Sequence, residues 1–304
     1  MTAVAERAPA TTEAVAYRRR RIRWGRVGLH LFLIAMSLLW LFPLVYAVYT
    51  SLRSYADTAE HGYASLTLSL NIDNYITAWN QAQIPHYFIN TLIIVVPGVA
   101  IVIFLASMVA FTVSRFRWRF NLALLMFFTA ANLLPAQVVI TPLYRLYLAL
   151  PLPAPLSDNG VFYDQYFGVM VIHIAYQLGF CVFVLSNFMK TIPNELTEAA
   201  VVDGAPIWKI FWSVTLPLCK PALAALATLE FTFMYNDFFW ALILIFTGNK
   251  LPVTSALNNL KGEFFINNNL VAAGAVLVAL PTLIVYFALQ RQFISGLTLG
   301  STKG

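Results

Sequence analysis

The sequence predicts an all-α membrane protein with six transmembrane helices, both termini in the cytoplasm, and a helical cytoplasmic segment between the fourth and fifth spans. Three observations predict this fold class. Of the 304 residues, 60% are hydrophobic and 11% are charged, whereas a soluble domain carries roughly 25% charged residues. The apolar residues form six long runs, and the basic residues gather in alternate segments between these runs.

Each of the six runs is long enough to cross a bilayer, since a helix needs about 20 apolar residues to span the roughly 30 Å hydrocarbon core. The first run is too long for the apolar core of a signal peptide, and no small-residue cleavage site follows it, so we expect an anchor. The runs are Val27–Leu52, Tyr87–Ser114, Phe120–Tyr144, Gln165–Met189, Pro221–Asn249 and Phe264–Gln290.

The distribution of Lys and Arg orients these spans. With six spans both termini share a side, and 15 of the 19 basic residues then lie on that side. Cytoplasmic segments carry an excess of Lys and Arg, so the termini and the second and fourth loops are placed in the cytoplasm. Because the basic residues adjoin membrane segments, the formal charge of +6 does not indicate nucleic acid.

The spans divide the chain into a central membrane domain and two cytoplasmic tails. The expected parts are a basic N-terminal tail at 1–26, a six-span domain at 27–290 with a cytoplasmic loop at 190–220, and a C-terminal tail at 291–304.

The two cysteines adjoin apolar runs and are expected to be small packing residues.

The loop between the fourth and fifth spans is polar and helix-forming, and its prolines and glycine predict two short helices joined by an elbow. The range Asn194–Val202 predicts a helix with Glu195 and Glu198 near its N-terminus, where the helix dipole favours negative charge. Gly204 supplies a turn because glycine accepts a positive φ. Pro206 can open the second helix.

The second helix has an apolar face at helical spacing, formed by Ile207, Ile210, Phe211 and Val214. Two interpretations are open. The segment could lie on lipid headgroups as an interfacial helix with tryptophan anchors, or it could dock into a groove on a partner protein. The residues alone favour neither.

The same loop carries the pattern E-A-A, three residues, G, nine residues, an aliphatic residue, one residue and L-P. This pattern resembles the coupling motif of ABC importer permeases. Residues 30–304 resemble the second permease subunit of the maltose-type carbohydrate importers, a binding-protein-dependent transport inner membrane component. Val214 in place of isoleucine, Pro206 and the long external loop 151–164 depart from the family pattern. Other resembling segments are Leu134-Pro135, Pro142–Tyr144, Ser186–Ala205, Asn236–Phe238 and Gln290–Gly304.

The resemblance implies a permease subunit of a bacterial ABC importer in the inner membrane, forming half of a translocation path for a carbohydrate, expected to be a di- or oligosaccharide. The implied partners are a second six-span permease in a heterodimer, two ATPase subunits and an extracytoplasmic solute-binding protein. ATP and Mg would be bound by the ATPases, and this chain would bind no cofactor. The implied ATPase-coupling residues are Glu198, Ala199, Ala200, Asp203, Gly204, Leu216 and Pro217.

Two carboxylates interrupt the fifth apolar run. Glu230 and Asp237 each cost about 2.5–3.5 kcal/mol near a helix centre, and their spacing predicts one shared helix face with roughly 10 Å between them. Aromatic rings beside amides and carboxylates suit a sugar. The alternatives are structural bonding between helices and, for Trp240, a packing or lipid-facing role. The candidate path residues are Glu230, Tyr235, Asn236, Asp237, Phe239 and Trp240.

The sequence lacks the motifs of several functional classes. The sequence has no G-x-x-x-x-G-K-[ST] loop for ATP phosphates, no Cys or His cluster with metal-ligand spacing, and no recognisable nucleophile–base set. We therefore expect no enzyme activity and no metal site. His173 is isolated and is expected to be a bonded interior histidine.

Three rival interpretations remain open. The chain could be an ion-gradient-driven secondary transporter that uses Glu230 and Asp237 as ion carriers, although six spans without an inverted repeat match that class poorly. It could be a membrane-embedded enzyme that uses the same carboxylates with His173. Within the family, it could import glycerol phosphodiesters or polyols.

Overall fold

The computed structural model describes residues 24–67, 69–116, 119–132, 134–261 and 266–298. The chain divides into two units, Met1–Tyr46 and Ala47–Gly304. Most of the expected N-terminal tail and residues 299–304 of the expected C-terminal tail lie outside the described residues.

Apart from two isolated β-bridges, the regular structure in the described part of the chain is helical. The α-helices are α1 Trp24–Ser51, α2 Tyr55–His61, α3 Asp73–Gln81, α4 Ile84–Arg115, α5 Asn121–Asn132, α6 Ala136–Ala149, α7 Tyr166–Met189, α8 Glu195–Val202, α9 Ile207–Ile210, α10 Leu216–Leu218, α11 Lys220–Tyr235, α12 Phe239–Leu244, α13 Val253–Ala256 and α14 Asn268–Thr298. Short 3-10 helices cover Ala154–Leu156, Gly248–Lys250 and Leu257–Leu260, and a π-helix covers Phe211–Thr215.

The first unit contains most of α1, and this helix is apolar on all sides. None of its most apolar stretch is buried within the chain. A helix satisfies its backbone hydrogen bonds internally, so a helix that is apolar all round beyond Arg26 in its first turn is suited to lipid.

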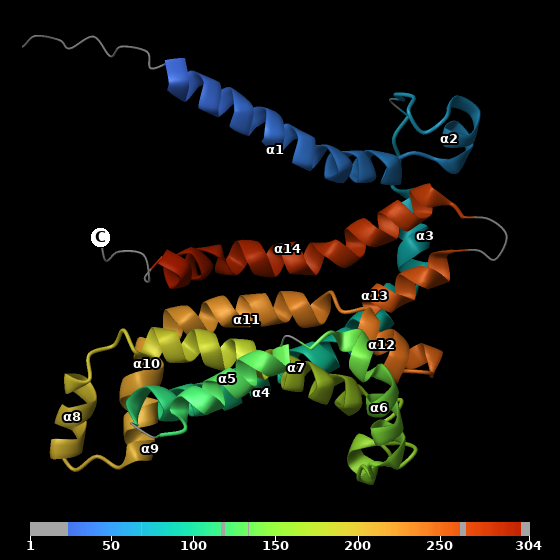
Figure 1. The fold of residues 1–304 in the computed structure, drawn as a ribbon. Coiled ribbons are helices and arrows are strands. Elements are labelled where there is room, and N and C mark those ends of the chain that lie inside the picture. Colours follow the sequence, from blue (N-terminus) through green and yellow to red (C-terminus); the bar gives the residue numbers. More distant parts are fainter. Residues whose placement is uncertain (1–23, 68, 117–118, 133, 262–265, 299–304) are drawn as a thin grey trace, which may run out of the picture. The chain divides into compact units, whose positions relative to one another are not determined.

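The core of the second unit is formed by α4, α7, α11 and α14. Helix α4 lies along α7 and contacts α11, which packs against α14 (Figure 1). Small residues permit close approach: a Cβ added to Gly98 of α4 would lie 3.1 Å from the Met234 sulfur, and Ala106 is fully buried. Such contacts favour helix association in lipid, where no hydrophobic effect drives it. Cys181 and Cys219 are both free and buried, as expected of packing residues.

Four helices in the described part of the chain are long and apolar enough to cross a membrane, and one bent helix pair adds a fifth. The four correspond to the first, second, fourth and sixth predicted runs. The prediction of six spans is therefore met in part, and the count of six stays a prediction. The four helices are Gly25–Ser51, Ile84–Arg115, Tyr166–Met189 and Asn268–Gln290, and the pair is Ile207–Leu218 with Lys220–Tyr235.

The third and fifth predicted runs are each broken into two helices. In the third run, Pro135 takes an extended backbone (φ −60°, ψ 130°) before α6, since proline lacks the N–H that would continue a helix. In the fifth run, α11 ends at Tyr235 and α12 begins at Phe239. There the Asp237 carboxylate accepts hydrogen bonds from the N–H groups of Trp240 and Ala241, which are unpaired donors at the start of any helix.

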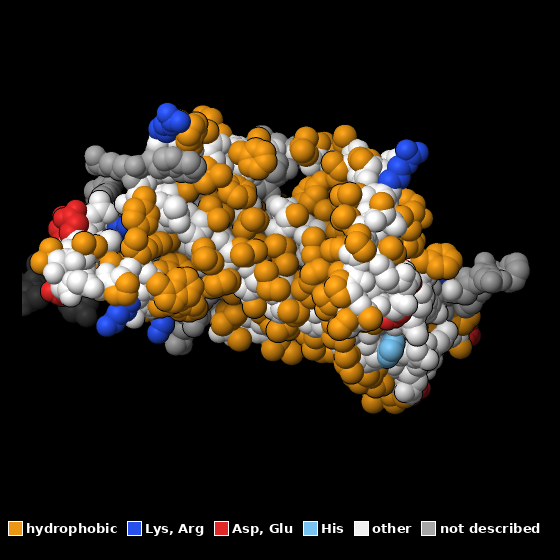
Figure 2. Space-filling view, turned by 90° about the horizontal axis from the view of Figure 1, so that it is seen from below, with side chains coloured by type: hydrophobic (Ala, Val, Ile, Leu, Met, Phe, Trp, Pro, Cys, Tyr) orange, Lys and Arg blue, Asp and Glu red, His pale blue; other side chains and the backbone are white. Residues whose placement is uncertain are grey.

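Apolar side chains dominate the central band of the face in Figure 2, while the charged side chains gather towards its ends. This distribution matches a bundle whose middle lies in hydrocarbon and whose ends lie in water.

A buried arginine organises the segment between α1 and α4. Arg53 is 1% exposed, its guanidinium lies 2.6 Å from the Asp57 carboxylate, and it donates to three carbonyls in the turn at 62–65. The Arg53 carbonyl in turn accepts hydrogen bonds from the side chains of Asn74 and Asn269. The charge is thus paired and hydrogen-bonded, as a buried ion must be, and it connects this segment to α3 and α14.

We expect Arg53→Ala to destabilise the protein by about 3 kcal/mol, because removing one partner of a buried pair leaves the other uncompensated. The measurement is thermal unfolding of the detergent-solubilised chain. The matched control is Arg145→Ala, at an exposed arginine of α6, which should leave the transition unchanged. Equal midpoints for the two variants would show that Arg53 does not organise this segment.

Candidate functional site

The predicted helix, elbow and second helix are present at one end of the second unit, where α8 lies apart from the long helices (Figure 1). Helix α8 carries Glu195 and Glu198 in its first turn, as predicted. Gly204 has a φ of +75°, and the Ala205 N–H donates to the Ala200 carbonyl at 3.0 Å. A left-handed glycine with this returning hydrogen bond is the Schellman end of a helix, so the elbow depends on a residue without a Cβ.

None of the residues of helix α8 is buried, and all but the half-buried Thr197 and Ala200 are exposed. Its apolar side chains face outward: Leu196 is 45%, Val201 58% and Val202 87% exposed. An isolated helix of this length is unstable in water, and grouped exposed apolar side chains mark an interaction surface. Of the predicted coupling residues, Glu198, Ala199, Asp203, Gly204 and Pro217 are exposed, and Ala200 and Leu216 are half-buried.

The chain between the elbow and α11 does not form one regular helix. A π-helical turn at Phe211–Thr215 follows α9, and the segment Ile207–Leu218 meets α11 at an angle of 76°. A π turn inserts an extra residue into a helix and often lies at a functional site. It shifts the side-chain register just before Leu216 and Pro217.

The four residues of the predicted apolar face of the second helix differ in burial. Ile210 and Phe211 are buried at 2% exposure, and Val214 packs against the same core. Ile207 is 56% exposed instead. The reason is that Ile207 lines a recess of about 180 Å³ against the end of α4 rather than filling a contact.

The two carboxylates of the fifth run do not share a helix face, contrary to the prediction, because α11 ends at Tyr235 before Asp237 is reached. Glu230 lies in α11 and is fully buried. The Cys181 thiol of α7 donates to its Oε1 at 3.2 Å. Glu230 therefore lies at the contact between α11 and α7.

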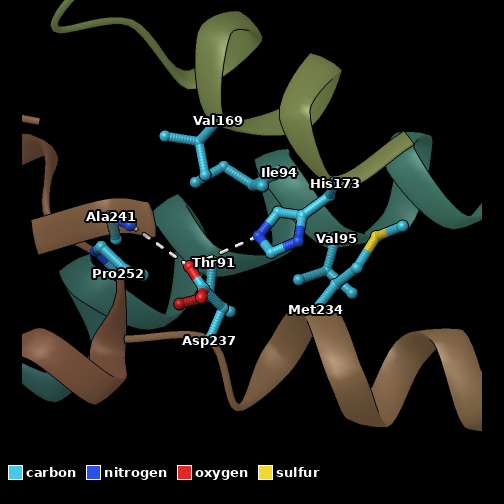
Figure 3. A pocket seen from close by; sticks show the side chains of 9 residues that line it. All are labelled: Thr91, Ile94, Val95, Val169, His173, Met234, Asp237, Ala241 and Pro252. Atoms are coloured by element: carbon cyan, nitrogen blue, oxygen red, sulfur yellow. Dashed lines mark hydrogen bonds and ion pairs between the residues drawn. The ribbon is translucent and has the colours of Figure 1, made fainter. Parts of the chain in front are cut away.

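Asp237 lies in a pocket of about 10 Å³ between α4, α7 and α12, and Figure 3 shows His173 pointing towards it. His173 Nε2 is 3.4 Å from Asp237 Oδ2, and His173 is 5% exposed, so it is an interior histidine as predicted. The Thr254 hydroxyl donates to the Asp237 carbonyl at 2.6 Å. Asp237 therefore connects the break after α11 to α7 and α13.

The other path candidates differ in exposure. Tyr235 is fully buried, and its hydroxyl donates to a backbone carbonyl of α14 at 2.8 Å. Trp240 is 6% exposed and lies 5.3 Å from the Tyr176 ring. Asn236 is exposed and Phe239 is half-buried. Of the six candidates, only Asn236 is exposed on this chain, and the assignment of all six to a solute path stays a prediction.

One polar network was missed by the sequence reasoning. Asp164, at a φ of +61°, accepts hydrogen bonds from the N–H groups of Phe246 and Thr247 at 2.8 Å and from the Thr247 hydroxyl. Lys250 donates to the Asp164 carbonyl at 3.0 Å and pairs with Asp158 at 2.6 Å. The network fastens the loop before α7 to the segment after α12. No local motif marks it, since its partners are more than 80 residues apart.

Among the described residues, no group of three or more His, Cys, Asp or Glu side chains is placed to hold a metal ion.

Residues 102–298 match the family model described as "Binding-protein-dependent transport system inner membrane component". The fold of apolar helices and the exposed elbow fit an integral membrane permease. Because the match covers more than half of the chain, the chain belongs to this family of transport-system inner membrane components.

Relatives and solved structures agree with this membership. The melibiose/raffinose/stachyose import permease protein MelC of Bacillus subtilis is 30% identical over 263 residues, which cover 86% of this chain and 91% of MelC. The osmoprotective compounds uptake permease protein GgtD of Synechocystis sp. is 30% identical over 287 residues, covering 92% of this chain and 93% of GgtD. A chain of a bacterial ABC transporter involved in the import of the acidic polysaccharide alginate superposes with a TM-score of 0.75 at 23% identity, covering 94% of this chain and 100% of that chain.

The Asp164 network predicts a pH dependence of stability. Burial opposes ionisation of Asp164, but the hydrogen bonds from Thr247 and Phe246 and the charge of Lys250 outweigh it and hold the pKa below its ordinary value. A depressed pKa stabilises the folded state above the unfolded pKa of about 4, and this contribution is lost as the pH falls through the lower folded pKa.

We therefore expect the thermal midpoint to fall as the pH drops below about 4. Asp164→Asn should be less stable at neutral pH and should lose less on acidification. Asparagine tolerates a positive φ, so the backbone is kept in the variant. Midpoints measured between pH 3 and pH 7 check this, and parallel profiles for the two proteins would contradict the role of Asp164.

Proposed function

We propose that this chain is one permease subunit of a bacterial ABC importer for a carbohydrate, expected to be a di- or oligosaccharide, in the inner membrane. It would pair with a second six-span permease, two ATPase subunits that bind ATP and Mg, and an extracytoplasmic solute-binding protein. The chain itself would hydrolyse no ATP. The observation that carries this proposal is the exposed α8 elbow on a chain of this family.

The elbow supports a docking role through its exposed side chains and its rigid turn. Leu196, Val201 and Val202 offer an apolar surface that fits a cleft of a partner. The Schellman end at Gly204 fixes the angle at which the chain leaves α8. A displacement of α8 is then transmitted through this turn to the helices that follow it, from α9 to α11. In this proposal, closure of the two ATPases supplies that movement.

The solute path is proposed to run past the break after α11. Asn236 is exposed there, and its neighbours in sequence Phe233 and Phe238 are 51% and 40% exposed. An amide pairs with sugar hydroxyls, and rings cover the C–H faces of a sugar. Glu230 and Tyr235 are buried, so we assign them to holding α11 against α7 and α14, while Asp237, Phe239 and Trp240 shape the break.

The names of several relatives support a carbohydrate as the solute. MelC is named for melibiose, raffinose and stachyose. The probable starch degradation products transport system permease protein AmyC of Thermoanaerobacterium thermosulfurigenes is 30% identical over 275 residues, covering 89% of this chain and 94% of AmyC.

The coupling role predicts that Gly204→Val and Glu198→Lys abolish coupled uptake but leave membrane insertion intact. A β-branched residue at a positive φ is strained, so the valine variant loses the elbow, and the lysine reverses the charge at the start of α8. The measurement compares solute uptake with ATP hydrolysis in proteoliposomes that contain the complete transporter. We expect uptake per ATP to fall by roughly tenfold or more, as a loss of about 1.4 kcal/mol in coupling would give.

The matched control is Gly160→Val. Gly160 also has a positive φ, +78°, with open space around it, but it lies in the loop before α7. This control should retain coupling. Normal uptake per ATP in both elbow variants would refute the proposed function.

The path assignment predicts opposite results for two substitutions in and after α11. Asn236→Leu should raise the KM for uptake by roughly tenfold, because an unpaired sugar hydroxyl costs about 1–3 kcal/mol. Glu230→Gln should keep ATP-driven uptake, since the amide has the same shape and still accepts from Cys181. Loss of uptake in Glu230→Gln, together with loss in the wild type on adding a protonophore while ATP stays high, would favour an ion-driven transporter.

A further inference from the structure

The last residue of α4 contacts the chain that leads into the α8 elbow. The Arg115 guanidinium donates to the Ile192 carbonyl at 3.0 Å and to Asn194 Oδ1 at 2.7 Å. These partners are 77 and 79 residues away in the sequence, so the contact joins two separate parts of the fold. Asn194 directly precedes α8, and its carbonyl accepts the N–H of Glu198 at 2.9 Å. Arg115 thus holds the residue from which α8 starts.

The far end of the same loop also rests on α4. Phe211 is 2% exposed, and its ring lies 5.3 Å from the ring of Phe111. This second contact is apolar, and a further ring pair, Phe104 with Trp212 at 6.1 Å, supports it. The Arg115 contact is different, because charge-assisted hydrogen bonds are short and directional. Of the two contacts, that of Arg115 is the one made through hydrogen bonds to the chain that enters α8.

Helix α4 connects this contact to the region of the proposed path. It packs along α7 and α11 over its length, and its Thr91 lines the pocket of Asp237 (Figure 3). Thr91 Oγ1 also accepts the N–H of Val253 at 2.9 Å. Thr91 lies roughly 36 Å from Arg115 along the helix, at 1.5 Å of rise per residue. Arg115 and Thr91 thus lie towards opposite ends of one helix, with Pro97 between them.

We infer that Arg115 is a positioning residue that transmits movement of the α8 elbow into α4 through its hydrogen bonds to Ile192 and Asn194. This inference rests on the proposed function, and it names the connection inside this chain that the coupling uses. A purely local role is the alternative, in which a basic residue in the last turn only complements the helix dipole of α4.

Four variants separate these roles in the complete, reconstituted transporter. Arg115→Ala removes the contact, and Arg115→Lys keeps the charge for the dipole but loses the planar fork. Asn194→Ala removes one acceptor without touching α4, and Asn194→Asp keeps an acceptor. We expect all four to assemble with the ATPases and to hydrolyse ATP. Uptake per ATP should fall roughly tenfold in both alanine variants, clearly in Arg115→Lys, and little in Asn194→Asp.

Two controls make the result specific. Arg119→Ala changes a neighbouring exposed arginine whose guanidinium lies over the Phe120 ring at 4.6 Å, and it should behave as the wild type. The double variant Arg115→Ala with Asn194→Ala should be no worse than Arg115→Ala alone, since the two residues act through one contact.

A direct readout follows the movement itself. Ile89 is 58% exposed near the opposite end of α4, and both native cysteines are buried, so Ile89→Cys offers a single reactive thiol. We expect ATP to change the rate at which a thiol reagent modifies this cysteine, and Arg115→Ala to abolish that change. A merely structural role for Arg115 would leave the ATP response intact.

The outcomes distinguish the inference from the function on which it rests. If Arg115→Ala and Asn194→Ala keep normal uptake per ATP while Gly204→Val loses it, the role of Arg115 is overturned and the proposed function stands. If Gly204→Val is normal as well, the proposed function fails. If Arg115→Ala does not assemble but Arg115→Lys and Asn194→Ala transport normally, Arg115 is structural and the inference is also overturned.

Discussion

The left-handed turn at Gly204 is the constraint on which the α8 elbow of this chain depends. Its φ of +75° lets the Ala205 N–H return to the Ala200 carbonyl, which ends α8 and sets the direction of α9. Helix α8 has no buried residue, and of its apolar side chains it is the half-buried Ala200 that packs against the core. Its position is set by this turn at one end and by the chain held at Asn194 at the other.

In the rest of the second unit, polar contacts with little exposure to solvent hold separate segments of the chain together. Arg53 joins the segment after α1 to α3 and α14, Asp164 joins the loop before α7 to the segment after α12, and Asp237 joins the break after α11 to α7. Buried polar groups that are fully paired specify one arrangement of a core. The exposed elbow is the exception, which is what a subunit that is moved by a partner requires.

The sequence predicts those parts of the fold that depend on local chemistry. Long uncharged runs identify α1, α4, α7 and α14, and Pro193, Gly204 and Pro206 place the elbow to within a residue. Hydropathy does not show that the helix breaks at Asp237. The break depends on the hydrogen bonds that the Asp237 carboxylate accepts from the first N–H groups of α12, inside an otherwise apolar run. Likewise, the burial of Glu230 against Cys181 and the role of Arg115 depend on residues that only the tertiary fold brings together.

Contact between α8 and an ATPase is the central claim, and site-specific photo-crosslinking tests it most directly. A photoreactive residue at Val202, which is 87% exposed, would be compared with one at Leu66, which is 91% exposed in the segment before α3. Both would be placed in the full chain, co-expressed with the other subunits of the proposed transporter. The account predicts an adduct with the ATPase from position 202 and none from position 66. No ATPase adduct from position 202, or equal adducts from both positions, would contradict it.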